Sequence, residues 1–327
     1  MKRRNKVQVL ILLSTLVFVG YIYGQENDNP FSRTQALLKD GVVYFNVDGI
    51  KITAQKKDAD FSAKNCINEF PHLKIKKKQL TTDSLLGFQN YYVFKSIEKP
   101  QHFFSNIAYY FVHSPDDYII AFTFKSINKR DKEFERNFIS LACNHRIPQN
   151  IYHSTVPDNF NFAGRIISSP SHNCKWLGVN NIQCPQCGQM NWSIHKDFDD
   201  ALATVNNQFV SVSSRERMKI ISDTIVNVIF EEVETSARKV IYNFTEKRSH
   251  FRMPQGNRSI PYFGPGLGIS LTFYIYLTPA PSHKLMFYFV AAPVRGNFVS
   301  CVLSFWENDP INSGGLPPLL EQVMKLK

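Results

Sequence analysis

Three of the six cysteines of this 327-residue chain lie in one segment, residues 172–195, HNCKWLGVNNIQCPQCGQMNWSIH. Thiolate sulfur and imidazole nitrogen are ligands that Zn²⁺ prefers, and Cys-x-x-Cys followed by Gly is typical of a zinc-ribbon knuckle. The residues that would hold the ion are three cysteines and one histidine: Cys174, Cys184, Cys187 and either His172 or His195. A ribbon usually has two knuckles, whereas this segment has one, so zinc is an alternative and not the preferred interpretation.

The same cysteines permit two other chemistries. A thioredoxin-like Cys-x-x-Cys needs one thiolate at the amino terminus of a helix, but Cys187 is followed by GQMNWSI, which has no helical spacing of apolar residues. A two-residue turn at Asn180-Asn181 would instead place Cys174 opposite Cys187, in a strand pair whose Cα atoms are about 4.5 Å apart. That distance suits a disulfide. The sequence therefore predicts a Cys174–Cys187 bridge in a structural hairpin, with zinc or differently paired thiols as alternatives.

Disulfides are expected because the amino terminus has the pattern of a secretory signal. Residues 2–6 are basic, an uncharged apolar run extends from Val7 to Gly24, and the chain then becomes polar. We prefer cleavage of residues 1–24; an uncleaved anchor is the alternative, since about 18 apolar residues is near the lower limit for a membrane span. Both interpretations place the bulk of the chain outside the cytoplasm, either in a periplasm or secreted.

The remaining cysteines suggest two further pairs. Cys66 and Cys143 each fall in a predicted helix, and a bridge between them would stabilise the fold by about 3–4 kcal/mol through the long loop that it closes. In the predicted hairpin, Cys184 points to the opposite face from Cys174, which makes Cys301 its candidate partner. Buried free thiols, which behave as small apolar side chains, are the alternative for both pairs.

Apolar periodicity and turn residues divide the chain into two halves, and the predicted disulfides would each lie within one half. Residues 26–150 contain a hairpin signal at Asp48-Gly49, further strands and a helix over Arg130–Cys143. Residues 155–327 contain the cysteine segment, a helix over Lys196–Phe209, more strands and a carboxy-terminal helix. We therefore expect an α+β fold of two similar domains, each an antiparallel sheet with helices packed on it.

Two short matches indicate an internal repeat. Tyr110-Phe111-Val112 matches Tyr288-Phe289-Val290, and Val47-Asp48-Gly49-Ile50 matches Val179-Asn180-Asn181-Ile182, in the same order in both halves. The order of elements around them resembles the small α+β domains of the PsbP/DcrB-like group, over most of both halves. Members of that group are mostly non-catalytic interaction or accessory modules, so the resemblance implies a binding role and assigns no functional residue.

Composition and motifs narrow the function. The net charge is +11, but its lysines and arginines are spread along the chain except for a run at residues 74–78, which a solvated loop or strand explains more simply than a nucleic-acid site. The sequence contains no GxSxG, HExxH or phosphate-loop motif. We assign no catalytic residue and, apart from the zinc alternative, no cofactor.

We therefore predict an exported, non-enzymatic accessory protein that binds another protein, in a role such as toxin neutralisation or envelope assembly. Its predicted partner surface is the aromatic rim formed by Trp176 and Trp192 beside an edge strand. One alternative is a zinc-stabilised or redox module at residues 172–195. The other is an extracytoplasmic hydrolase or carbohydrate-active enzyme that uses the glycine- and proline-rich loop 253–268. The candidate residues near that loop are His250, Tyr262 and Phe263.

Overall fold

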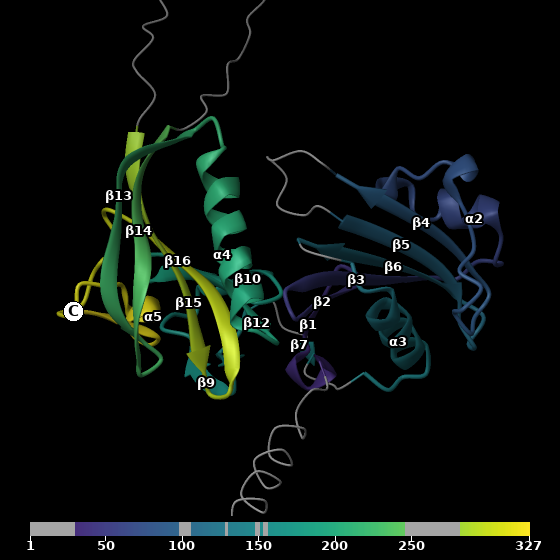
Figure 1. Ribbon diagram of the computed structural model, residues 1–327, viewed down its shortest axis with the longest axis horizontal. Coiled ribbons are helices and arrows are strands. Elements are labelled where there is room, and N and C mark those ends of the chain that lie inside the picture. Colours follow the sequence, from purple (N-terminus) through teal and green to yellow (C-terminus); the bar gives the residue numbers. More distant parts are fainter. Residues whose placement is uncertain (1–29, 98–105, 128–129, 148–150, 153–155, 246–281) are drawn as a thin grey trace, which may run out of the picture.

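The computed structural model describes residues 30–97, 106–127, 130–147, 151–152, 156–245 and 282–327. Of these residues, 49% lie in strands and 19% in helices, so the fold is mostly β and the predicted α+β class is wrong. Large, curled antiparallel sheets dominate the molecule (Figure 1). The expected carboxy-terminal helix contributes little: α5 covers only Pro318–Glu321 before the chain returns to a strand.

The first sheet has seven strands in the order β4-β5-β6-β3-β2-β1-β7, antiparallel except for the β1–β7 pair. Its strands are β1 (Gln35–Lys39), β2 (Val42–Val47), β3 (Ile50–Lys57), β4 (Asn90–Ser96), β5 (Asn106–His113), β6 (Ile119–Ser126) and β7 (Ile151–Tyr152). Its helical elements are η1 (Pro30–Arg33), α2 (Ala63–Asn68), η2 (Pro71–Leu73), η3 (Lys77–Gln79) and α3 (Lys132–Cys143). The predicted Asp48-Gly49 turn is confirmed: it joins β2 to β3, and both residues have positive φ, as such turns require.

Apolar side chains lie on both faces of the first sheet. Strand alternation sends Tyr110 of β5 toward α3, where it joins a cluster around Phe138, and sends Phe111 to the opposite face, where it joins Cys66 of α2. Asp131 caps α3 by accepting a hydrogen bond from the Phe134 backbone N–H. The sheet is therefore the middle layer between α3 and the short helices around α2.

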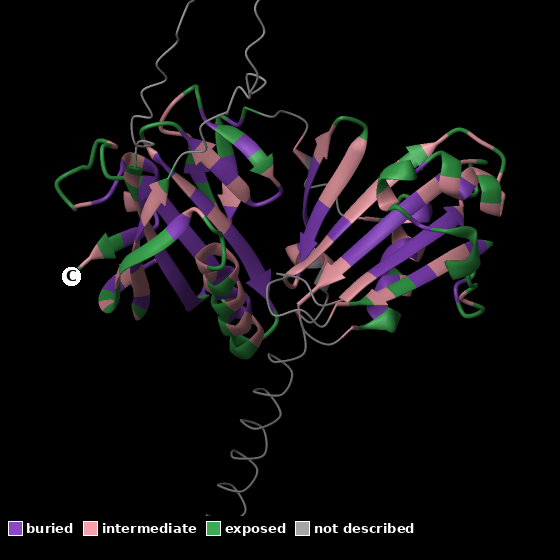
Figure 2. Cartoon of the chain, turned by 90° about the horizontal axis from the view of Figure 1, so that it is seen from above, coloured by how far each residue is buried: buried purple, intermediate pink, exposed green. Residues whose placement is uncertain are grey.

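The second sheet has eight antiparallel strands in the order β10-β11-β12-β16-β15-β14-β13-β17. They are β10 (Lys175–Gly178), β11 (Asn181–Cys184), β12 (Gly188–His195), β13 (Met218–Phe230), β14 (Val233–Thr245), β15 (Ser282–Val294), β16 (Asn297–Trp306) and β17 (Met324–Leu326). Helix α4 (Phe198–Ser213), close to the predicted one, covers one face. The hairpin of β8 (Asn159–Phe162) and β9 (Arg165–Ser168) covers the other face together with α5. Buried residues follow the middle of both sheets (Figure 2).

The two sheets share a strand order. The run β4-β5-β6-β3-β2-β1 in the first corresponds to β14-β15-β16-β12-β11-β10 in the second. The matched tyrosines follow this correspondence, because Tyr110 faces α3 and Tyr288 faces α5, the last helix of each half. An internal duplication would produce this arrangement; the duplication itself stays a prediction.

Polar and apolar contacts join the halves. The amide of Asn46 on β2 donates to the hydroxyl of Ser193 on β12, with 2.8 Å between the heavy atoms, and both side chains are buried. The β2–β3 turn abuts the end of β12, where a Cβ on Gly49 would lie 2.5 Å from the imidazole of His195. Leu37 of β1 belongs to the core of the second sheet. Position 49 therefore needs glycine for both its positive φ and this close approach.

Candidate functional site

The cysteine hairpin has a different register from the predicted one. Gly178 pairs with Asn181, so the turn is Val179-Asn180, and a bulge between Trp176 and Gly178 then shifts the pairing further. Asn180 adopts the left-handed φ of 56° that asparagine tolerates better than most residues. The result is a Cys174–Cys184 disulfide with 4.0 Å between the Cα atoms. The predicted Cys174–Cys187 pairing is wrong, because the earlier turn and the bulge move Cys184 into the position expected for Cys187.

Cys187 is instead a thiol in the turn between β11 and β12, where its backbone N–H donates to the carbonyl of Cys184. Burial, and secondarily the carboxylate of Asp309, raise the pKa of this thiol. A reactive Cys-x-x-Cys needs the opposite shift, toward a stable thiolate. The geometry therefore favours a structural turn over the redox alternative.

The zinc alternative conflicts with the disulfide in both of its ligand sets, and the set that uses His195 also fails on distance. Gly188, next to Cys187, and His195 lie at opposite ends of β12, which at about 3.3 Å per residue separates them by roughly 23 Å. Cys174 and Cys184 are consumed by their disulfide. Among the residues that the structure describes, no group of three or more His, Cys, Asp or Glu side chains could hold a metal ion.

The other cysteines are unpaired and buried. Cys66 lies on the α2 side of the first sheet and Cys143 on its α3 side, so the sheet separates them and the predicted bridge is wrong. Burial raises the pKa of each thiol to about 12. Cys301 is fully buried in the second core, and its candidate partner Cys184 is bonded to Cys174. These three thiols fill space in apolar clusters.

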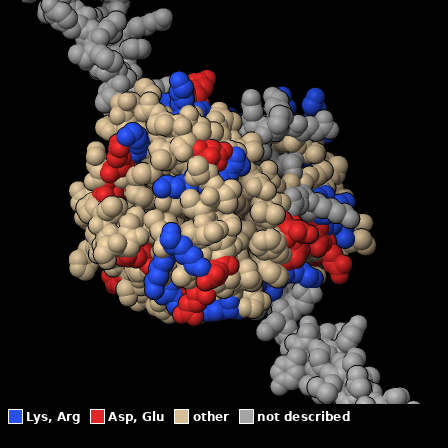
Figure 3. All heavy atoms as spheres, turned by 60° about the vertical axis from the view of Figure 1, so that its left-hand side comes forward, with Lys and Arg blue, Asp and Glu red and all other residues tan. Residues whose placement is uncertain are grey.

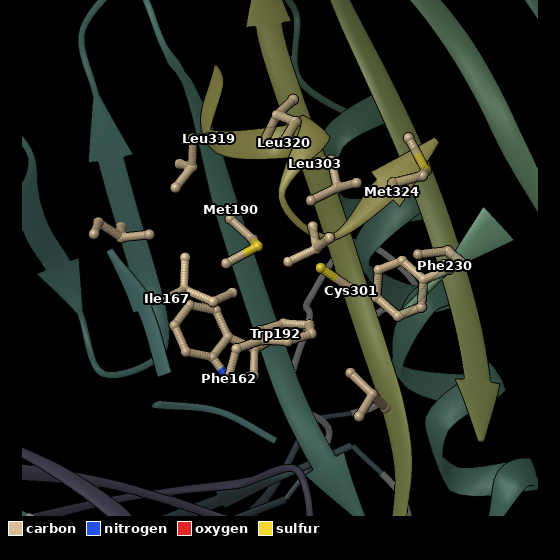
Figure 4. Close-up of a cluster of buried hydrophobic side chains, with 14 of the residues drawn as sticks. Phe162, Ile167, Met190, Trp192, Phe230, Cys301, Leu303, Leu319, Leu320 and Met324 are labelled. Atoms are coloured by element: carbon tan, nitrogen blue, oxygen red, sulfur yellow. The ribbon is translucent and has the colours of Figure 1, made fainter. Parts of the chain in front are cut away.

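The predicted partner surface lies inside the protein. Trp176 and Trp192 are 2% and 0% exposed, and their ring centroids are 6.0 Å apart. Phe160 and Phe162 of β8 pack against them, and Figure 4 shows Trp192 among the apolar side chains of this core. The prediction is wrong because the β8–β9 hairpin folds over this face of the sheet.

A serine–histidine pair offers the nearest approach to hydrolase chemistry. The Nε2 atom of His195 lies 2.9 Å from the hydroxyl of Ser300. Both residues are at most 1% exposed, and burial lowers the pKa of His195 from its ordinary value of 6.5 to about 4. A nucleophilic serine must reach substrate, and this one does not. This pair was not among the predicted hydrolase residues; those, His250, Tyr262 and Phe263 in or near loop 253–268, lie outside the described residues.

A cavity of about 720 Å³ lies on the α4 side of the second sheet, and polar side chains line its floor. We call it the amide groove and define it by its polar floor and wall residues: Asn181, Gln183, Gln189, Asn191, Ser304, Gln208 and Ser211. The floor side chains are neighbours across the strands, since Gln189 pairs with both Gln183 and Ser304. The amide of Gln189 donates to the side-chain oxygen of Asn181 at 3.0 Å. The floor is thus a set of neighbouring side chains that can donate and accept hydrogen bonds.

The wall of the amide groove is formed by α4. Gln208 and Ser211 line it, three residues apart and so on one side of the helix, and Arg215, just after the end of α4, continues the wall. A helix that packs on a sheet normally turns apolar residues inward, as α4 does elsewhere through Ala201 and Val205. Gln208 is only 7% exposed, and within the described part of the chain its Oε1 atom has no hydrogen-bond partner. The polar floor therefore faces a polar wall with an unused acceptor.

The two ends of the amide groove differ. Lys51, from β3 of the first sheet, lies at the end near the junction of the halves, and burial together with Lys125 lowers its pKa. Trp306 and Asp309 lie at the opposite end, where the Asp309 carboxylate accepts from the Trp306 backbone N–H. Trp306 is 37% exposed, unlike the two buried tryptophans.

Sequence reasoning missed this site. One signal was available: Asn181 and Gln183, then Gln189 and Asn191, alternate with apolar residues, which places amides together on one face of two adjacent strands. Without the register we could not place Ser304 or Gln208 beside them.

The surface shows mixed charge. In Figure 3, Lys and Arg side chains lie beside Asp and Glu rather than in a continuous basic patch. The second sheet carries ion pairs such as Arg238–Asp223, at 2.6 Å. The lysines of the 74–78 run are exposed around η2 and η3. Within the described ranges, no helix has the length and apolarity needed to cross a membrane, and the predicted signal, residues 1–24, lies outside them.

Comparison of the chain with models of protein families, with curated proteins and with solved structures finds no match. The resemblance to PsbP/DcrB-like domains therefore stays a prediction. The site has to be interpreted from its own geometry.

Proposed function

We propose that this chain is an exported binding protein without catalytic activity, and that the amide groove is its binding site. The observation that carries the proposal is the Gln208 acceptor, which is buried above a floor of amides and has no hydrogen-bond partner among the described residues. A buried polar atom without a partner costs about 1–3 kcal/mol, a cost that a bound ligand would remove. The cavity volume also falls in the range of small-molecule sites.

The chemistry of the groove favours recognition over reaction. Carboxamides neither titrate near neutral pH nor act as nucleophiles, but each presents two N–H donors and an acceptor. The buried Ser300–His195 pair is not among the groove's lining residues. The amide groove can therefore orient a ligand through hydrogen bonds, and we assign it no bond-breaking step.

Export is the second part of the proposal. The Cys174–Cys184 disulfide is compatible with an oxidising compartment. The basic and apolar residues of segment 1–24 provide the secretion signal. We place the protein in a periplasm or the extracellular medium.

The test is ligand capture by the full exported chain. Wild-type protein and the variant Gln208→Met are incubated with an extract of the native cell envelope, and bound molecules are identified by native mass spectrometry. We expect a ligand on the wild type that is depleted on Gln208→Met, which keeps the size of the side chain but removes its polar atoms. Gln55→Met is the matched control, because Gln55 also has a buried, unpaired Oε1 but lies outside the groove. Equal capture by all three proteins would remove the groove from the proposal.

A protein partner is the second candidate, and β13 favours it. Within the described residues, only Val228–Phe230 of this strand pair with β17, so residues 219–227 form an outer edge. Ile221 and Ile225 are 54% and 68% exposed there. Such an edge can receive an extended strand from a partner. Crosslinking in the native envelope fraction tests this: Ile225→Lys should abolish a partner adduct that the control Ile311→Lys retains.

A further inference from the structure

We propose that the ligand of the amide groove is a neutral oligosaccharide, an inference that rests on the proposed function of this groove. The features that point to it are the amide floor, the buried Gln208 in the wall, and an exposed aromatic ring at the mouth. Each constrains the ligand in a different way.

The floor requires a ligand rich in groups that both donate and accept. Asn181, Gln183, Gln189 and Asn191 each carry an amide with donor and acceptor atoms. A sugar hydroxyl likewise donates one hydrogen bond and accepts others. Side chains two positions apart on one strand are about 7 Å apart, and those on neighbouring strands about 5 Å apart. This grid suits a ligand with hydroxyls repeated along its length.

Gln208 adds a point of contact from above the floor. Its Oε1 atom accepts no hydrogen bond within the described chain, although the residue is only 7% exposed. Ser304 in the floor is also buried, at 6% exposure. A hydroxyl donor placed between floor and wall would satisfy the Gln208 oxygen. A ligand without donors would leave it unsatisfied.

Trp306 supplies an apolar surface. Its ring packs edge-on against Phe244, with centroids 5.5 Å apart, and His283 lies at 6.2 Å in a similar orientation. These contacts hold the indole in place while more than a third of the residue stays exposed. A sugar ring has an apolar face of C–H groups, and an aromatic face is a favourable surface for it. The ring and the amides together match the two kinds of surface on a pyranose.

An extended peptide fits this floor less well. Peptides that bind sheets usually pair with the backbone of an open edge strand. Here β11 is already paired with β10 and β12, and β12 with β11 and β16, so the floor strands have no open edge. Only side chains face the ligand. Lys51 and Asp309, of opposite sign, lie at opposite ends and Arg215 lies on the wall, whereas the floor itself carries no charged side chain.

The test is titration of the full exported chain with three neutral hexasaccharides: maltohexaose, cellohexaose and chitohexaose. Trp306 fluorescence and calorimetric heat report binding; the emission change belongs to Trp306, because Trp176 and Trp192 are buried. We expect saturable binding of at least one sugar. Gln208→Met and Trp306→Ala should each weaken binding about tenfold, the loss of one hydrogen bond or one ring contact. Gln55→Met should bind like the wild type.

The outcomes separate this inference from the proposed function. A neutral asparagine-rich hexapeptide that binds in a Gln208-dependent manner, with no binding of any sugar, would overturn the oligosaccharide and leave the binding groove intact. Sugar binding that neither Gln208→Met nor Trp306→Ala changes would place the sugar elsewhere and overturn the inference. If no probe binds and envelope capture is also independent of Gln208, the proposed function fails with it.

Discussion

The α2 side of the first sheet and the α4 side of the second occupy corresponding positions, and the amide groove lies on the α4 side. Phe111 faces α2 in the first sheet, and its counterpart Phe289 faces α4 in the second. On both sides, the apolar contacts of the helix lie over the β4–β6 meander or its equivalent, β14–β16. Beyond these meanders, β2 of the first sheet and β12 of the second present polar residues on the same face, such as Asn46 and Asn191.

Helix length explains the difference. Helix α2 has 6 residues and α4 has 16. The longer helix has room for polar side chains beside its apolar contacts, which run from Ala201 to Val212, so Gln208 and Ser211 form a wall above the polar strands. The comparison shows that two sheets with the same strand order can differ in this way: a groove forms where the covering helix is longer and carries polar side chains next to its apolar ones. The following predictions test it in order of expected effect.

Removing a core ring on the opposite side of the second sheet should have the largest effect. Trp192→Ala should lower the free energy of unfolding by about 3–5 kcal/mol, because a buried aromatic side chain leaves a cavity. Trp306→Ala, at the groove mouth, should cost under about 1 kcal/mol. Urea unfolding at neutral pH measures both. Equal losses of unfolding free energy in the two variants would mean that Trp306 is also part of the hydrophobic core.

Lowering the pH should destabilise the fold at the contact between the two halves, because the buried His195 at that contact resists protonation. Its folded pKa of about 4 lies below its ordinary 6.5, so the unfolded state binds the proton more tightly. The stabilisation is complete above pH 6.5 and is lost progressively as the pH falls to about 4, amounting to about 2 kcal/mol between pH 7 and 5. Urea unfolding of wild type and His195→Gln at both pH values measures this contribution as the difference in pH dependence. An unchanged slope in the variant would contradict the buried neutral imidazole.

The disulfide should stabilise the edge of the second sheet. Its cysteines are 10 residues apart, and the double variant Cys174→Ser, Cys184→Ser should lose about 2–3 kcal/mol of unfolding free energy. Cys187→Ser is the control and should change stability by less than about 0.5 kcal/mol. Peptide mapping of the oxidised protein should find Cys174 joined to Cys184; a bridge that contains Cys187 would refute the register.

The polar strands of the two halves should be coupled. Asn46→Ala and Ser193→Ala each remove one partner of a buried hydrogen bond, at a cost of about 1–3 kcal/mol. A double-mutant cycle should give a coupling energy of about 1 kcal/mol. Additive losses would show that the two polar strands meet without a specific contact.

Gln208→Met should weaken ligand binding without lowering stability. Because its Oε1 atom has no partner in the described part of the chain, an apolar replacement should leave the free energy of unfolding unchanged or raise it by about 1 kcal/mol. Urea unfolding without ligand gives the value, with Gln55→Met alongside. A loss above about 2 kcal/mol would show that Gln208 serves the fold rather than a ligand.

Local signals in the sequence predicted local structure. The Asp48-Gly49 turn and the position of α4 follow from residues adjacent in the chain. The cysteine pairing failed because one left-handed Asn180 and one bulge decide the register, and the sequence allows either turn. The tryptophans were misplaced because the β8–β9 hairpin that buries them comes from a segment we had not recognised as strands.

The fold class and the groove depended on packing between distant segments. Short apolar stretches such as residues 58–70 and 314–327 were consistent with longer helices, but the structure gives α2 and α5 only a few residues each. The groove combines β11, β12, β16 and α4, so no local window of sequence contains it. Pairing over such distances has no local signature, which is why these features could not be predicted.

The pairing of β12 with β16 also constrains the order in which the chain can fold as it is synthesised. His195 lies opposite Phe298, so β12 must wait for a strand close to the carboxy terminus. The first sheet, by contrast, is complete once Tyr152 has emerged. Contacts between distant residues form slowly and leave strands exposed meanwhile. While the rest of the chain is synthesised, the amino-terminal half can fold first and present Asn46 and Gly49 to the second half, whereas the amide floor forms only when β16 is available.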